Sequence, residues 1–206
     1  MQLVGMLDSP YVRRTAISLQ LLGIAFTSRP ISVFSAVDAF RAINPVIKAP
    51  TLVAADGTVL MDSNLILDYA ETLAGPARSL WPGALDARLR ALRLTGLALA
   101  ACEKAVQIVY EQRLRPAHKQ HAPWLDRVQM QLWAALDALE AELHSAPPPP
   151  ATGGQPLGQA GVTLAVAWSF MQLLIPERVC AERFALQAAF AAQAEALPVF
   201  RDWPQV

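Results

Sequence analysis

The 206-residue sequence has few charged residues and no excess of either sign. Charged residues make up 17% of the chain against 54% hydrophobic residues, and the formal net charge is zero. The high hydrophobic content excludes a disordered chain. The charge balance gives no electrostatic reason to expect a nucleic acid or a membrane as a partner. We therefore expect a globular protein rich in alanine and leucine helices.

Cysteine is scarce, and long hydrophobic runs are missing. Cys102 and Cys180 form no C-x-x-C motif and no metal-binding pattern. Both lie in apolar sequence, which predicts two buried free thiols and no metal site. No signal peptide is recognisable, which favours a cytoplasmic location. The most apolar run, 162–175, is too short to span a bilayer and predicts a buried helix.

The most informative stretch is a hairpin signal in the first third of the chain. Two short apolar runs, 50–54 and 58–61, flank Asp56-Gly57, the kind of dipeptide that most strongly indicates a tight β-hairpin. Proline is tolerated at the first residue of a strand, because no ladder hydrogen bond is required there. Pro50 is therefore expected to open the first strand of this hairpin.

Polar residues stand on both sides of the predicted hairpin. Lys48 and Ala49 precede it, and a cis Ala49–Pro50 bond would let Ala49 offer its backbone N–H and C=O to an extended peptide. Asp62 and Ser63 follow it, where the strand leads into the next predicted helix. Ser63 is expected to cap the exposed backbone N–H groups of that helix, and such groups can also hold an anion.

Strand and helix patterns alternate over roughly the first 75 residues. Ser9 followed by Pro10 is a favoured start for a helix. The order of elements is β-α-β-α-β-β-α, which predicts a mixed four-stranded sheet with helices on its faces. The predicted strands are 2–7, 26–33, 50–54 and 58–61, and the predicted helices are 10–22, 36–43 and 64–74.

Beyond a linker at 80–83 the patterns are helical only, which indicates a domain boundary. The sequence therefore predicts an α/β domain over residues 1–79 and an all-α domain over residues 84–206. A proline- and glycine-rich segment, 145–161, is expected to form a loop. The predicted helices of the second domain are 85–115, 124–143, 162–175 and 177–196, and Phe200 and Trp203 are expected to anchor the tail by packing.

Several of these motifs together resemble the glutathione S-transferase superfamily, in particular its serine-type bacterial members. The resemblance covers nearly the whole chain and rests on Ser9-Pro10-Tyr11-Val12-Arg13-Arg14 after the first strand, Asn44-Pro45 through Lys48-Ala49-Pro50, Asp62-Ser63 before a helix, Leu80-Trp81-Pro82 and the helical second half. It implies a thioredoxin-like first domain that binds glutathione, an all-helical second domain, and an active site in the cleft between them. It also implies a role in detoxification and a homodimer formed through 64–74 and the start of 85–115.

The resemblance assigns roles to individual residues. Ser9 would stabilise the glutathione thiolate, because a hydroxyl at a helix N-terminus donates to an anion that the helix dipole also favours. Ala49, with Pro50 beside it, would pair with the cysteinyl backbone of glutathione. Asp62 and Ser63 would hold its γ-glutamyl end, and Lys48 would balance its glycine carboxylate. The pocket for a hydrophobic electrophile is expected to be lined by Tyr11, Tyr110, Arg113 and Trp168.

Other functions fit the sequence less well. A hydrolase with Ser9 as its nucleophile would need a histidine base and usually a G-x-S-x-G elbow. The sequence has no such elbow, and all three histidines lie in the helical half. Thioredoxin-type redox chemistry would need cysteine in place of Ser9. By themselves, Ser9 and Asp62-Ser63 are ordinary helix starts. Three alternatives stay open: another glutathione-dependent enzyme (isomerase, dehalogenase or peroxidase), a non-catalytic glutathione-binding protein, and a scaffold.

One position departs from the family pattern. Many members begin the buried helix of the second domain with a Ser/Thr-x-x-Asp cap. Here Thr163 is predicted to keep the cap, but Val166 stands where the acid would be. Loss of that reciprocal hydrogen bond removes about 0.5–2 kcal/mol of local stability.

Overall fold

The structure is a computed structural model that describes residues 1–146 and 157–205. It divides into two compact units, which are described separately. The first unit consists of Met1–Trp81 and Ala196–Val206, and the second of Pro82–Glu195. The end of the chain thus packs with the α/β unit, whereas the sequence pattern groups all of 84–206 together.

The first unit confirms the predicted order of strands and helices. The strands are shorter than the apolar runs that predicted them, because only three residues of each run form ladder pairs. The elements are β1 (Gln2–Val4), α1 (Pro10–Leu21), β2 (Thr27–Arg29), α2 (Val37–Arg41), β3 (Thr51–Val53), β4 (Val59–Met61), α3 (Ser63–Ala74), the 3₁₀ turn Pro76–Arg78 and α8 (Pro198–Asp202).

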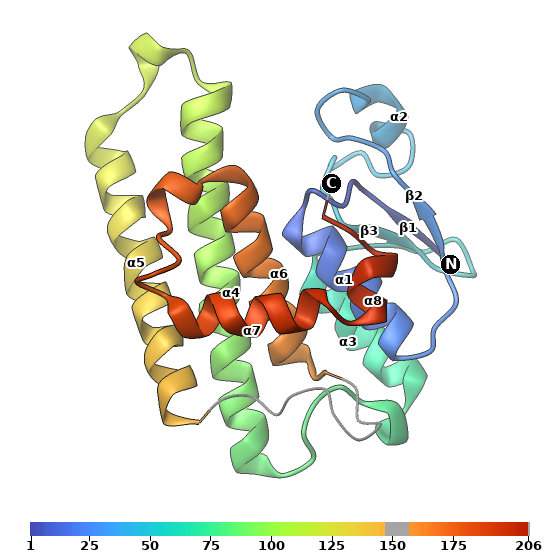
Figure 1. The fold of residues 1–206 in the computed structure, drawn as a ribbon. Coiled ribbons are helices and arrows are strands. Elements are labelled where there is room, and N and C mark those ends of the chain that lie inside the picture. Colours follow the sequence, from blue (N-terminus) through green and yellow to red (C-terminus); the bar gives the residue numbers. More distant parts are fainter. Residues whose placement is uncertain (147–156, 206) are drawn as a thin grey trace. The chain divides into compact units, whose positions relative to one another are not determined.

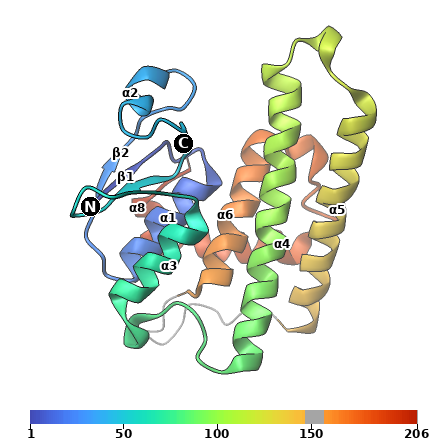
Figure 2. The same cartoon turned by 180° about the vertical axis from the view of Figure 1, so that it is seen from behind.

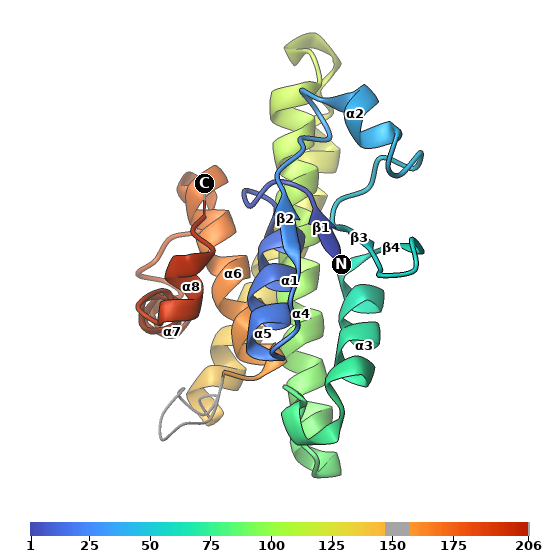
Figure 3. The ribbon, with the colours of Figure 1, turned by 90° about the vertical axis from the view of Figure 1, so that its right-hand side faces the viewer.

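The sheet has the order β2-β1-β3-β4 (Figure 3). β1 pairs with β2 in parallel, while the β1–β3 and β3–β4 pairs are antiparallel. The hairpin turn lies at Asp56-Gly57, where Gly57 has a φ of 87° and Asp56 Oδ1 accepts a 2.9 Å hydrogen bond from the Thr58 N–H. That backbone bond lowers the pKa of the Asp56 carboxyl group. The predicted mixed, thioredoxin-like sheet is therefore confirmed.

The core of the first unit lies between one face of the sheet and the helices α1 and α3. Leu3 and Leu52 are register partners on β1 and β3, so their side chains share that face. α2 is set apart from α1 and α3 (Figures 1 and 2). The buried residues of this core are Leu3, Val12, Ala16, Leu19, Leu22, Leu52, Ile66, Ala70 and Leu80.

The second unit is helical, as predicted. α4 packs against both α5 and α6, and α7 packs on α6 (Figure 1). Among the described residues, no helix combines the length and the apolar character needed to cross a bilayer. The elements are α4 (Leu85–Val109), a π-helical turn (Tyr110–Leu114), α5 (Ala122–Ser145), α6 (Gln159–Leu174), α7 (Ala185–Glu195) and the 3₁₀ turns Ala117–Lys119 and Pro176–Arg178.

The predicted start of the buried helix is wrong. α6 begins at Gln159, and Thr163 lies one turn inside it, where its hydroxyl donates a 2.7 Å hydrogen bond to the Gln159 carbonyl. The small residues Ala160 and Gly161 continue the helix beyond the apolar run from which its start was predicted. Thr163 therefore provides no N-cap. Of the loop predicted at 145–161, residues 147–156 lie outside the described part of the chain.

The two cysteines have different environments. Cys102 on α4 is 2% exposed, which confirms a buried free thiol. The same prediction is wrong for Cys180, which is exposed in the loop before α7. Its thiol donates a 2.8 Å hydrogen bond to the Glu182 carboxylate. The apolar residues around Cys180 in the sequence belong to a chain reversal that turns this thiol outward.

Candidate functional site

Three chain segments converge at one end of the sheet. Val4, Thr51 and Met61 pair across β1, β3 and β4. β1 ends at Val4, β3 begins at Thr51, and β4 ends at Met61. Because the neighbouring strands are antiparallel, the residues after Val4, before Thr51 and after Met61 lie along the same edge. These are the segments that contain the predicted glutathione-binding residues.

Gly5 brings the first two of these segments into contact. Its φ of 142° is rarely adopted by residues with a side chain, and an added Cβ would lie 2.6 Å from Val12 Cγ2 and 3.1 Å from Ala49 Cβ. The loop between β1 and α1 therefore runs directly against Ala49. The Ala49–Pro50 peptide bond is cis.

Ser9 is the N-cap of α1, as the sequence predicts. Its backbone is extended, with φ −74° and ψ 123°, and Pro10 takes the first helical position. The Ser9 Oγ accepts a hydrogen bond from the Val12 N–H at 3.4 Å, which is long for such a bond. Since the oxygen is the acceptor in this bond, the hydroxyl proton can be donated to an anion at the helix N-terminus.

Asp62, and not Ser63, is the N-cap of α3. Asp62 has a φ of 72°, and its Oδ1 accepts a 2.9 Å hydrogen bond from the Asn64 N–H. The prediction of a Ser63 cap is wrong because this left-handed residue starts the helix one position earlier. Asp62 Oδ2 also lies 3.6 Å from Lys48 Nζ, with both side chains about half exposed, so this ion pair contributes little stability.

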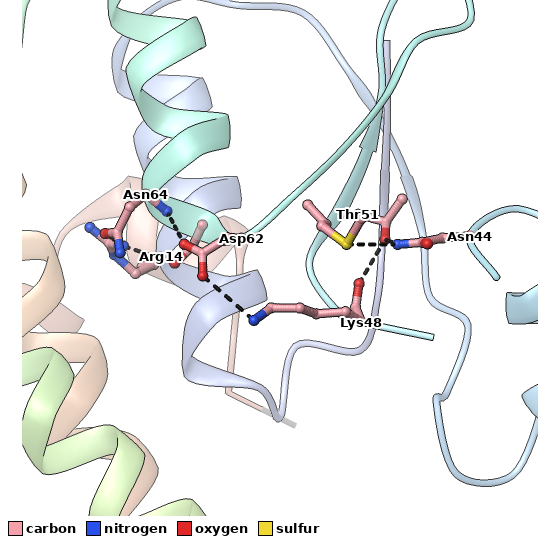
Figure 4. A network of polar contacts seen from close by, with 8 residues as sticks. Arg14, Asn44, Lys48, Thr51, Asp62 and Asn64 are labelled. Atoms are coloured by element: carbon pink, nitrogen blue, oxygen red, sulfur yellow. Dashed lines mark hydrogen bonds and ion pairs between the residues drawn. The ribbon is translucent and has the colours of Figure 1, made fainter. Parts of the chain in front are cut away.

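Arg14 on α1 reaches the start of α3. Its Nη1 donates 2.9 Å hydrogen bonds to Ser63 Oγ and Asn64 Oδ1 (Figure 4). Arg14 and Ser63 are only 2% and 3% exposed. Arg14 belongs to the motif 9–14 that carries the family resemblance, but the sequence assigned it no role of its own.

A second polar network holds the loop that carries Ala49. Asn44 Nδ2 donates to Thr51 Oγ1 at 2.8 Å, and that hydroxyl donates to the Lys48 carbonyl at 2.7 Å (Figure 4). Asn44 Oδ1 also accepts a 3.0 Å hydrogen bond from the Val46 N–H. Asn44 and Thr51 are buried. Sequence reasoning noticed Asn44-Pro45 as a motif but assigned no role to Asn44 or Thr51.

The four residues predicted to line an electrophile pocket lie in both units. Tyr11 is half-buried in the first turn of α1, and Tyr110 is 46% exposed where α4 ends. Arg113 Nη2 donates a 2.8 Å hydrogen bond to the Leu174 carbonyl, which ties the π-helical turn to α6. Trp168 is buried within α6. Their role in substrate binding stays a prediction.

Glu111, next to Tyr110, has a structural role instead. Its carboxylate accepts hydrogen bonds of 2.8 Å from the His121 backbone N–H and from Arg115 Nε. The backbone hydrogen bond, followed by the smaller effect of Arg115, lowers the pKa of the Glu111 carboxyl group. Glu111 thereby fixes the end of α4 to the start of α5.

The converging segments combine charges of both signs. The N-termini of α1 and α3 lie at the same edge of the sheet, and each contributes a positive partial charge from exposed N–H groups. The Arg14 guanidinium adds a full positive charge behind Ser63. The Asp62 carboxylate stands beside them as the negative group. This arrangement suits a ligand with an ammonium group and a carboxylate close together.

Comparisons with known proteins identify the family to which the chain belongs. Residues 3–78 match the model of the glutathione S-transferase N-terminal domain. The chain is also 33% identical over 143 residues to YibF, an uncharacterised GST-like protein of Escherichia coli K12, and the match covers 69% of this chain and 70% of YibF. The chain belongs to the glutathione S-transferase superfamily.

Solved structures of this superfamily share the fold. A glutathione S-transferase of Methylobacterium radiotolerans in complex with glutathione sulfonate is 25% identical, with a TM-score of 0.86 over 98% of this chain and 92% of the other. A family member of Pseudomonas fluorescens Pf-5 with bound glutathione is 26% identical, with a TM-score of 0.82 over 100% and 98% of the two chains. The predicted fold class is thus confirmed.

Proposed function

We propose that the protein is a glutathione S-transferase that joins the thiolate of glutathione to a hydrophobic, electrophilic small molecule. The observation that carries this proposal is the placement of the Asp62 carboxylate beside the Ser63 hydroxyl at the start of α3, with Arg14 bonded to Ser63 at 2.9 Å. The γ-glutamyl end of glutathione carries an ammonium and a carboxylate on one carbon, so its binding site must offer a negative group and positively polarised donors close together.

Each charged group at the γ-glutamyl end has a partner in this arrangement. The ammonium group binds the Asp62 carboxylate, and the carboxylate accepts from the Ser63 hydroxyl and from N–H groups at the start of α3. Arg14 strengthens the Ser63 hydroxyl as a donor, because a hydroxyl that accepts from a cation is polarised. Asp62 also has a positive φ of 72°, and residues in this region cluster at ligand sites.

The rest of glutathione extends from α3 toward α1. The backbone of its cysteinyl residue pairs with Ala49, next to Pro50, and its glycine carboxylate is balanced by Lys48. The thiol then faces the N-terminus of α1, where the Ser9 hydroxyl donates to the thiolate. A hydrogen bond to a charged group is worth about 1.5–3 kcal/mol, or about one to two pKa units.

The lowered pKa makes the sulfur nucleophilic at neutral pH. A free thiol has a pKa of about 8.5, so a shift of about one to two units leaves a substantial fraction of thiolate. The thiolate donates its electron pair to an electrophilic carbon, and the leaving group departs with the electrons of the broken bond. The roles of Tyr11, Tyr110, Arg113 and Trp168 in binding the electrophile are part of this proposal.

We further propose a homodimer built on α3 and the start of α4. Both helices carry large apolar side chains in contact with solvent: Leu65 and Leu73 are 64% and 51% exposed, and Leu85 and Leu89 are 79% and 67% exposed. Sedimentation velocity of the Leu89→Arg variant measures this directly. The wild type is expected to sediment as a dimer and the variant as a monomer, whereas a monomeric wild type contradicts the proposal.

Isothermal titration with reduced glutathione tests the binding site. The wild type is expected to bind with micromolar to low-millimolar affinity, and Asp62→Ala and Ser63→Ala are each expected to lose detectable binding. Asp68→Ala is the matched control, since Asp68 is an exposed acid on the same helix, and it should bind as the wild type does. Absence of heat and of thermal stabilisation in the wild type at millimolar glutathione would refute the proposed function.

Activity separates transfer from the alternatives. A panel of aromatic halides, isomerisable dienones, dehalogenation substrates and organic peroxides identifies the reaction, with Ser9→Ala as the variant that should slow it. Binding without turnover of any of them would support a non-catalytic glutathione-binding protein.

A further inference from the structure

A segment near the end of the chain, residues 197–205, packs along α1 in the first unit and contains α8 (Figure 1). We call it the C-terminal strap. Its contacts fall into two groups. One group surrounds Arg13 and the loop before Ser9, and the other surrounds Gln20 near the opposite end of α1.

Arg13 anchors the strap to α1. Its side chain is fully buried, and its Nε donates a 2.8 Å hydrogen bond to the Trp203 carbonyl. Its Nη2 donates to the Phe200 carbonyl at 3.4 Å, and the guanidinium lies 5.5 Å from the centre of the Phe200 ring. A buried guanidinium requires such acceptors, because burial without them is costly. The strap is therefore held in one position along α1.

Gln205 connects the strap to the loop that precedes Ser9. Its Nε2 donates hydrogen bonds to the carbonyls of Leu7 at 3.2 Å and Asp8 at 3.0 Å. Its Oε1 accepts a 3.4 Å hydrogen bond from Arg13 Nη1. One amide group thus binds two consecutive carbonyls of the loop, while the buried arginine holds its oxygen.

The two hydrogen bonds donated by Gln205 fix the orientation of the peptide groups that precede Ser9. Each carbonyl oxygen lies in a planar peptide unit, so holding the oxygen orients the whole unit. The Asp8 carbonyl belongs to the Asp8–Ser9 peptide group, which also carries the Ser9 N–H. The Ser9 hydroxyl itself is bonded to its helix only at 3.4 Å, so its position depends on the loop that carries it.

We infer that Gln205 is a positioning residue for Ser9: it aligns the Ser9 hydroxyl with the sulfur of bound glutathione by holding the Leu7 and Asp8 carbonyls. This inference rests on the proposed function, because it gives Ser9 a thiolate to stabilise. Gln205 acts through the loop and touches neither the sulfur nor the electrophile. Its loss should therefore change the pKa of the bound thiol and kcat, with little effect on the KM for glutathione.

The contacts of Gln20 supply a matched control. The Trp203 indole N–H donates to Gln20 Oε1, and Gln20 Nε2 donates a 2.7 Å hydrogen bond to Asp202 Oδ2. The Trp203 ring also stacks on Phe26 with centroids 5.0 Å apart. Gln20→Met loosens the strap at these contacts and leaves the Gln205 bonds in place.

The experiment compares Gln205→Met with Gln20→Met in the full-length protein. The pKa of the bound glutathione thiol is measured from the ultraviolet absorbance of the thiolate, and kcat and KM are measured with 1-chloro-2,4-dinitrobenzene. In Gln205→Met the thiol pKa should rise by about half to one unit, and kcat measured at about pH 6 should fall by up to about three- to tenfold, the effect of a misaligned hydrogen bond to the thiolate. The KM for glutathione should stay within about twofold. Gln20→Met should keep the wild-type thiol pKa and kcat.

A second variant covers the case in which Gln205→Met does not fold. Gln205→Glu removes the donor amide but keeps an oxygen for Arg13, and it should raise the thiol pKa in the same direction. An unchanged thiol pKa in folded Gln205 variants overturns the inference. Equal changes in Gln205→Met and Gln20→Met overturn it too, because they indicate general loosening of the strap. A wild type that binds no glutathione refutes the proposed function, and the role of Gln205 falls with it.

Discussion

Ser9→Ala tests the proposed chemistry most directly. The Ser9 Oγ accepts its helix hydrogen bond at 3.4 Å, so we place the cost of losing this cap at about 0.5 kcal/mol, the low end of the N-cap range. The thiolate loses a charged hydrogen bond worth about 1.5–3 kcal/mol, which raises the thiol pKa by about one to two units. The substitution should therefore affect catalysis much more than folding.

The pH dependence of kcat/KM converts this shift into a rate. When the thiol pKa returns from about 6.5–7.5 to about 8.5, the fraction of thiolate at about pH 6.5 falls about 10- to 50-fold. At about pH 9 both forms are largely ionised, so the difference shrinks to less than about twofold. The expected result is a kcat/KM profile displaced toward high pH, measured with 1-chloro-2,4-dinitrobenzene and checked by the absorbance of the thiolate.

Ser9→Thr is the control, because threonine keeps both the hydroxyl and the capacity to cap. It should retain most of the activity at low pH. A Ser9→Ala profile with the wild-type midpoint would show that the hydroxyl does not stabilise the thiolate. A loss of activity that is equal at all pH values, together with a lowered melting temperature, would assign Ser9 to the structure of α1 alone.

Three further substitutions test other parts of the argument. Arg14→Met should weaken glutathione binding about 10- to 100-fold in titration calorimetry, because Ser63 loses its charged partner; unchanged affinity would remove Arg14 from the site. Gly5→Ala should lower the midpoint of urea unfolding, since its Cβ would lie 2.6 Å from Val12; an unchanged midpoint would contradict the required left-handed backbone. Glu111 has a lowered pKa, so its stabilisation is complete above about pH 4.3 and is lost on acidification through the folded-state pKa. In Glu111→Gln the stability measured by circular dichroism should therefore fall less steeply on acidification than in the wild type. An equal pH dependence of stability in the variant and the wild type would contradict this role.

The sequence predicted the α/β unit well because its signals are local. Asp56-Gly57 specifies a turn through backbone conformation, and Ser9-Pro10 specifies a helix start through one side chain and one fixed φ. Both features appear in the structure where they were predicted. The same locality explains the strand lengths, since an apolar run shows burial but does not show where ladder pairing stops.

The missed features depend on residues far apart in the chain. Arg14 bonds to Ser63 across 49 positions, and no local pattern distinguishes a buried arginine with a partner from an exposed one. The sequence does not reveal that Asp62 caps α3, because its left-handed backbone is not required by the neighbouring residues. The exposure of Cys180 likewise follows from a chain reversal and not from its apolar neighbours.

The burial of Arg13 has a consequence for biosynthesis. Residues 1–81 leave the ribosome before residues 82–195, and the carbonyls of Phe200 and Trp203 that bind this guanidinium are made only after both. Until then the Arg13 side chain must remain hydrated, so the face of α1 that carries it stays exposed to water. The α/β unit therefore reaches its final form only after the whole helical unit has been synthesised, and a nascent chain stalled between the two units should be sensitive to proteases around α1.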